Sequence, residues 1–280
     1  MLRLTRLFCV AALAAAAPAL ADDWQRSYNV SGTAVFSLDA ADARITLEGW
    51  DRPAISVRVE TPEGVGIGAR SIEIDERQNG DAVTVRVLDR RPWSPVRITW
   101  KSTHVVVRLP RNARLDVRTG DGSCEAGGID GDIHIESGDG AIHTDATGGR
   151  MRLETRDGRI IVRRGHGVLS AHTGDGRIEA DGVFSGLDLS SGDGSILAQV
   201  DSGSAAAEDW SLRTSDGRIR LTLPRDFDAD IEAHTSDGRI RFELPVRETM
   251  ERRRAKVRLG AGGRAVLLRS GDGSITVSQD

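Results

Sequence analysis

One feature restricts the fold of this chain more than any other: a short word built around an Asp-Gly pair recurs through its second half. The pair returns at a constant spacing at Asp121, Asp139, Asp157, Asp175 and Asp193, and wider steps then lead to Asp216, Asp237 and Asp272. A fixed period of this length is typical of a protein made from stacked supersecondary units. We therefore expect a repeat architecture over residues 119–280.

Each copy of the repeat carries the residue pattern of β-strands joined by a tight turn. Ser or Thr precedes the turn, and an apolar residue such as Ile160 or Ile178 follows three positions after the Asp. Apolar residues alternate with polar ones on both sides, which places them on one face of a strand. Asp-Gly is common where a turn needs a positive φ, so we interpret these pairs as structural turns. The predicted turn residues are Asp121, Gly122, Asp139, Gly140, Asp157, Gly158, Asp175, Gly176, Asp193, Gly194, Asp216, Gly217, Asp237, Gly238, Asp272 and Gly273.

Two all-β architectures satisfy this pattern. In a β-solenoid each unit of about 18 residues forms one coil, and equivalent positions stack on one another. In an antiparallel meander each Asp-Gly pair is instead the turn of a β-hairpin. The same side chains point inward in both, so the pattern leaves the choice open.

The residues before the repeat also alternate like strands but without its regularity. Segments such as ARITLEGW and AVTVRVLD are separated by Pro- and Gly-containing turns, and no linker divides them from the repeat. We expect one domain over residues 22–280, with irregular N-terminal strands over 22–118. These strands would cap one open end of the stack and so prevent end-to-end pairing.

The N-terminal segment, residues 1–21, has the layout of a secretory signal peptide. Arg3 and Arg6 precede an apolar run, and Ala19-Leu20-Ala21 supplies the small residues of a cleavage site. We expect cleavage after Ala21 and a periplasmic or secreted protein with no transmembrane anchor. Loss of the two arginines changes the formal net charge from −4 to −6, which does not favour nucleic-acid binding.

Three segments of the chain resemble the DUF4097 family, whose members carry the label putative adhesin. They are LPRNARLDVRTGDGS (109–123), LPRDFDADIEAHTSDGRI (223–240) and GAGGRAVLLRSGDGSITV (260–277), each a strand that enters the turn word. The resemblance covers most of the chain after residue 21. It implies a right-handed β-helix and so favours the solenoid, but it implies little about activity.

The turn aspartates invite comparison with calcium-stabilised β-rolls, whose coils also contain about 18 residues. Here Asp precedes Gly and only one edge carries it, and Arg159, Arg177, Arg218 and Arg239 follow two positions after their Asp. We expect these arginines to neutralise the aspartates without metal. None of the six histidines has the spacing of a metal ligand. The sequence therefore predicts no metal and no cofactor, with the calcium roll kept as an alternative.

No nucleophile motif is recognisable, and the one cysteine after residue 21, Cys124, occupies the apolar position of the first repeat. We expect Cys124 and Trp210 in the core. β-Helix folds can host polysaccharide lyases and hydrolases, so a carbohydrate-active enzyme is an alternative function. Its acids would come from the scattered outward set Glu125, Glu136, Glu154, Glu179 and Asp188.

One strongly basic segment interrupts the last repeat and is a candidate docking site, beside the one-sided Asp-Arg face of the turns, which could also form a binding surface. It contains Arg252, Arg253, Arg254 and Lys256, and we expect a projecting arm that could dock to an anionic envelope polymer or lipid headgroups. The leading hypothesis is an exported, non-enzymatic envelope protein that presents an adhesin-like or structural surface to an unknown polymer or protein.

Overall fold

The computed structural model describes residues 23–62, 65–68, 71–90, 103–244, 249–251 and 253–280. The predicted signal peptide with Arg3, Arg6 and Ala21 lies outside these residues, as does Arg252 of the predicted arm. All regular structure in the described part is β, and 23 strands join in one continuous sheet. No helix in these ranges could cross a membrane.

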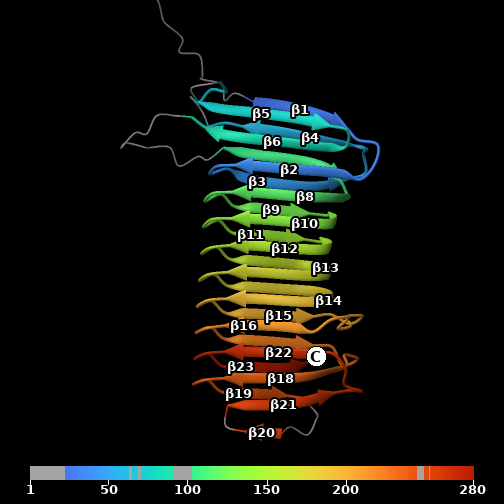
Figure 1. Ribbon diagram of the computed structural model, residues 1–280, viewed down its shortest axis with the longest axis vertical. Helices are drawn as coiled ribbons and strands as arrows, with labels where there is room; N and C mark the ends of the chain where they lie inside the picture. Colours follow the sequence, from blue (N-terminus) through green and yellow to red (C-terminus); the bar gives the residue numbers. More distant parts are fainter. Residues whose placement is uncertain (1–22, 63–64, 69–70, 91–102, 245–248, 252) are drawn as a thin grey trace, which may run out of the picture.

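The strands form an elongated stack with two rows, shown in Figure 1. Ladder A is the row that precedes the turns, and ladder B is the row that follows them. In stacking order, ladder A contains β5 (Ile72–Asn79), β6 (Ala82–Asp89), β2 (Ala34–Ala40), β8 (Asn112–Thr119), β10 (Asp130–Ser137), β12 (Gly148–Thr155), the second halves of β13 (Ile160–Thr173) and β14 (Ile178–Ser191), β16 (Trp210–Thr214), β22 (Ala265–Ser270), β18 (Ala229–Thr235), β21 (Arg254–Leu259) and β20 (Thr249–Glu251).

Ladder B lies beside it in the same coils. In stacking order it contains β1 (Asp23–Asn29), β4 (Ala54–Glu60), β7 (His104–Pro110), β3 (Arg44–Trp50), β9 (Cys124–Gly127), β11 (Ile142–Asp145), the first halves of β13 and β14, β15 (Ile196–Val200), β17 (Ile219–Leu223), β23 (Ile275–Gln279) and β19 (Ile240–Glu243).

Parallel pairing through the repeat confirms the solenoid. Ile133 lies beside Met151, and Ile160 lies beside Ile178, each pair one repeat apart in the chain. A meander would pair the two strands of each turn in antiparallel fashion, and the repeat shows no such pairing between β8 and β17. That alternative is therefore wrong for these coils. The right-handed winding of the coils and the single domain over residues 22–280 stay predictions.

Alternating apolar side chains fill one core between the ladders, and a column of hydroxyl groups closes it at the turns. Cys124 and Trp210 are fully buried in this core, as the repeat pattern predicted. At each turn the buried Ser or Thr binds the neighbouring coil: the Thr173 hydroxyl donates to the Gly158 carbonyl at 2.9 Å and accepts from the Gly176 N–H at 3.2 Å. These bonds satisfy backbone groups that would otherwise be buried without a partner.

The turn glycines are needed for a different reason from the one expected. None of the eight has a positive φ, so the expectation of a positive-φ turn is wrong. Instead, a Cβ on Gly140, Gly158 or Gly176 would overlap the carbonyl oxygen of the glycine one coil earlier. Close stacking of backbone on backbone selects glycine here.

Both ends of the stack depart from simple coiling. At the N-terminal end, the strand pairs β1–β4, β4–β7 and β5–β6 are antiparallel, and the capping role of these strands stays a prediction. At the C-terminal end, the last coil is inserted out of sequence order. Strand β22 lies between β16 and β18, and β23 lies between β17 and β19, as Figure 1 shows by their red colour among orange strands.

Candidate functional site

The outward faces of both ladders carry charged side chains, and most of the acids considered for catalysis are held in ion pairs. Glu136 contacts Arg118 at 3.3 Å, and Glu179 contacts Arg177 at 3.2 Å. Glu154 contacts Arg152, and Asp188 lies 3.6 Å from Arg213. These acids sit beside arginines, as expected of a solvated β surface with alternating charge.

The turn aspartates form an exposed column along one edge of the stack. Their expected partners, Arg159, Arg177, Arg218 and Arg239, make no ion pair with them in the part of the chain that the structure describes, so that expectation is wrong. Arg156 instead contacts Asp139 at 2.7 Å, because it precedes its own turn aspartate and so faces the turn one coil earlier. Among the described residues, no three acidic, histidine or cysteine side chains could hold a metal ion together.

The basic segment is a capping hairpin and not a projecting arm. Strand β21 pairs with β18 in antiparallel fashion, and Ala255, Val257 and Leu259 are buried against the core. Arg253 is paired with Asp237 at 2.9 Å, and Lys256 contacts Glu232 at 2.5 Å. The segment alternates apolar and charged residues like the other strands. It therefore pairs with β18 and extends ladder A by one strand.

The fold gathers a basic row on the outer surface of ladder A near its C-terminal end. We define this row as Arg213, Arg269, His234 and Arg254, which lie in register on the adjacent strands β16, β22, β18 and β21. Adjacent strands are about 4.8 Å apart, so the row spans about 14 Å. Arg254 and Arg269 are exposed, and no ion pair with either is found among the described side chains. A hollow of about 450 Å³ adjoins the row between β18, β21 and β22.

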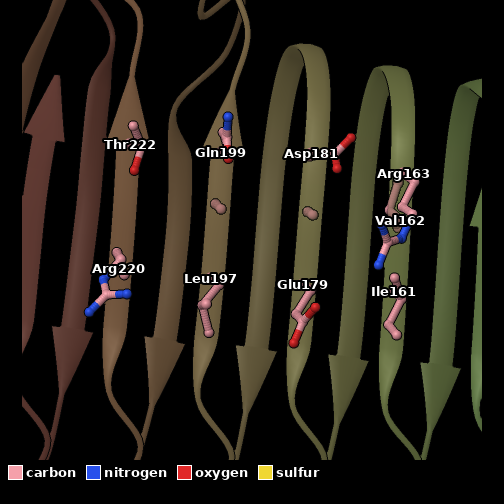
Figure 2. A pocket seen from close by; sticks show the side chains of 11 residues that line it. Ile161, Val162, Arg163, Glu179, Asp181, Leu197, Gln199, Arg220 and Thr222 are labelled. Carbon is pink, nitrogen blue, oxygen red and sulfur yellow. The ribbon is translucent and has the colours of Figure 1, made fainter. Parts of the chain in front are cut away.

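A second hollow of about 330 Å³ lies on ladder B (Figure 2). One line of side chains across it contains Ile161, Glu179, Leu197 and Arg220, and a second contains Arg163, Asp181, Gln199 and Thr222. Glu179 and Asp181 therefore sit two positions apart on one strand. The Asp181 carboxylate also accepts a hydrogen bond from the backbone N–H of Arg164 at 2.6 Å, so this side chain stabilises the neighbouring backbone.

Reasoning from the sequence named Arg254 as part of the predicted arm but missed the basic row itself. Its four residues lie on four strands that are separated in the sequence. Strand β22 of the inserted last coil lies between β16 and β18 and so brings their residues into one row. The single usable signal was the shared position of Arg213, His234 and Arg269, each immediately before the Ser or Thr of its turn.

Burial makes Cys124 unreactive. Its thiol lies in the core, and desolvation raises its pKa to about 12. Because the thiolate is the reactive species, we expect less than stoichiometric labelling of the native protein by a thiol reagent at pH 8 over hours, and complete labelling in denaturant. Time-resolved labelling followed by mass spectrometry checks this. Rapid labelling of the folded protein would show that the coil containing β9 opens readily.

Asp145 carries a testable electrostatic signature on the surface. Its hydrogen-bonded partner Arg164 lowers the pKa of this carboxyl below its usual 3.8. A depressed native pKa means that the interaction stabilises the fold above the unfolded pKa and is lost as pH falls through the native value. We expect Arg164→Gln to raise the Asp145 titration midpoint towards 3.8 in a carboxyl NMR titration, and Arg163→Gln to raise it far less. Equal shifts in both variants would contradict the assignment.

This chain is similar to one protein family and to several solved structures. The family model described as Toastrack DUF4097 matches residues 36–278. A solved "putative adhesin" from Bacteroides fragilis is 12% identical, with 92% of this chain and 97% of that chain covered and a TM-score of 0.49. A second, from Parabacteroides distasonis, is 9% identical over 92% and 97%, with a TM-score of 0.45. A "putative cell adhesion protein" from Clostridium sporogenes is 12% identical over 93% and 100%, with a TM-score of 0.34. No curated protein matches.

Proposed function

Since this chain belongs to the Toastrack DUF4097 family, we propose that it is an exported, non-enzymatic protein of the cell envelope that binds an anionic envelope polymer through the basic row. The signal-peptide pattern supports export, because residues 1–21 carry the charge, apolar run and cleavage residues of such a peptide. An adhesin-like role is part of this proposal, in agreement with the label that members of the family carry.

The basic row is the single observation that carries this proposal. Arg269 and Arg254 present exposed guanidinium groups on a rigid β surface, with His234 between them. Guanidinium groups bind phosphate and carboxylate through paired hydrogen bonds, and fixed spacing along a row suits a polymer with repeated charges. The overall charge is mildly acidic, whereas the basic row brings positive side chains together near the C-terminal end of ladder A.

The alternative, a polysaccharide lyase or hydrolase, would rely on Glu179 and Asp181 in the ladder B hollow. A binding role is favoured because these acids project from one strand and have arginine or backbone partners, whereas glycoside hydrolysis needs two carboxyl groups on opposite sides of a bound sugar.

Co-sedimentation tests the proposal. Purified residues 22–280 would be mixed with peptidoglycan, outer-membrane and lipopolysaccharide fractions of a Gram-negative cell. We expect saturable binding to one fraction that falls at least about tenfold in Arg254→Ser/Arg269→Ser, because two charge-assisted contacts are lost. The matched control Arg218→Ser/Arg239→Ser removes equal charge from the turn edge and should bind like the wild type.

Two outcomes would contradict the proposal. Binding to none of the fractions would exclude an envelope polymer as the partner. Equal loss in both double variants would show that net charge, and not the basic row, determines binding. Raised salt provides a further check, since exposed charge contacts weaken as ionic strength increases.

A further inference from the structure

A third hollow, of about 470 Å³, lies on ladder A next to the basic row. It is lined by residues of β12, β13, β14 and β16, and by Glu208 and Asp209 from the segment 201–209 that lies between β15 and β16. This segment is held beside β14 by hydrogen bonds from Ala205 to Phe184 and from Ala207 to Ser185. It accounts for the step from Asp193 to Asp216, which is longer than the constant step between the preceding turns.

Two oxygen atoms buried in this hollow lack hydrogen-bond partners among the described residues. Ser211 is only 9% exposed, and its hydroxyl is unpartnered. Asp188 lies beside it in register on the neighbouring strand, and its Oδ1 atom is buried without a hydrogen bond, 3.6 Å from the Arg213 guanidinium. Buried polar atoms of this kind are costly, so a ligand in the hollow that hydrogen-bonds to them would relieve that cost.

The charges around the hollow indicate what kind of ligand fits. Three arginines line it, and three acids balance them, so the lining has no net charge. The residues are Arg150, Arg152, Arg213, Asp188, Glu208 and Asp209. The lining offers both hydrogen-bond donors and acceptors, and Val168 supplies an apolar contact. A ligand hydroxyl placed between Asp188 and Ser211 can donate to the first and accept from the second. This chemistry fits a neutral, polyhydroxylated ring better than a free anion.

We propose that this hollow binds an uncharged sugar residue of a polysaccharide. The inference deepens the proposed function, on which it rests, because a polysaccharide that also carries acidic groups can occupy the hollow and the adjacent basic row together. It distinguishes a polysaccharide from a lipid headgroup as the envelope component that is bound. The volume lies within the range of about 300–1,000 Å³ that is usual for small-ligand sites.

The test uses residues 22–280 on a printed glycan array of neutral and acidic oligosaccharides, followed by calorimetry with the best binder. We expect binding to glycans that contain neutral sugars, weakened at least about tenfold in Asp188→Asn and in Ser211→Ala. The Ser211→Ala variant removes an unpartnered hydroxyl, so its thermal midpoint should not fall, which separates lost binding from lost folding. Gln199→Ala on ladder B is the matched control and should bind normally.

Absence of binding to every glycan on the array, or unchanged affinity in both variants, would overturn the inference. Binding confined to acidic glycans and unaffected by the two variants would also overturn it, since the basic row alone would then explain recognition. These results leave the proposed function intact if the wild type still sediments with an envelope fraction. Failure of that sedimentation, with glycan binding retained, would instead refute the envelope proposal alone.

Discussion

Deletion of residues 265–280 is expected to unfold the whole C-terminal end of the stack, although these residues form only the last coil in the sequence. Strands β22 and β23 separate β16 from β18 and β17 from β19. Their inward residues Val266, Leu268, Ile275 and Val277 are fully buried. Burial of four such side chains contributes about 6–12 kcal/mol, comparable with the total stability of a domain.

Hydrogen exchange with mass spectrometry is the appropriate measurement for this deletion. Amides of β16–β19 should lose protection, while those of β10, β11 and β12 should keep it, because each coil contacts only its neighbours. The distant coils therefore act as an internal control. Unchanged protection of β18 and β19 would contradict the insertion of the last coil, since a terminal coil at the outer end could be removed with little effect.

The second large effect is expected from Gly176→Ala. The new Cβ would lie far inside 3.0 Å of the Gly158 carbonyl oxygen, and this neighbour is backbone that cannot rotate away. The coils must separate locally, which also strains the bonds of the Thr173 hydroxyl to Gly158 and Gly176. We expect a loss of about 3 kcal/mol in the free energy of unfolding, measured by denaturant titration.

Gly127→Ala is the matched control for this substitution. Gly127 also lies in the repeat, but a Cβ there would make only ordinary contact with the Asp145 carbonyl oxygen at 3.7 Å. We expect a change within about 0.5 kcal/mol. Similar losses at both positions would show that glycine is required for reasons other than stacking of one coil on the next.

The repeat itself could be predicted from the sequence because the same residue types occupy the same positions in each copy, and these positions determine the register of the strands. A constant period with Ser or Thr, Asp-Gly and an apolar residue in fixed order determines which atoms stack, as the column from Ser137 through Thr155 to Thr173 shows. The burial of Cys124 followed from the same alignment. The reason for glycine did not, because a positive φ and a close backbone approach select the same residue.

The ends of the stack and the functional surface could not be predicted in this way. Strand β22 pairs with both β16 and β18, which are distant from it in the sequence. The local residue pattern does not determine which distant strands pair, so this insertion could not be predicted. The basic segment alternates like any edge strand, so its place on β18 and the pairing of Lys256 with Glu232 appear only in three dimensions. The basic row arises from that arrangement.

Binding without turnover is the central claim, and a time course with the sedimenting envelope fraction tests it most directly. Purified residues 22–280 would be incubated with that fraction, while bound protein and newly released soluble fragments or reducing ends are measured together. We predict saturable, reversible binding with no release above a buffer control. Steady release of soluble fragments that is abolished by Glu179→Gln would contradict the claim and identify the ladder B hollow as the active site of a polysaccharide-degrading enzyme.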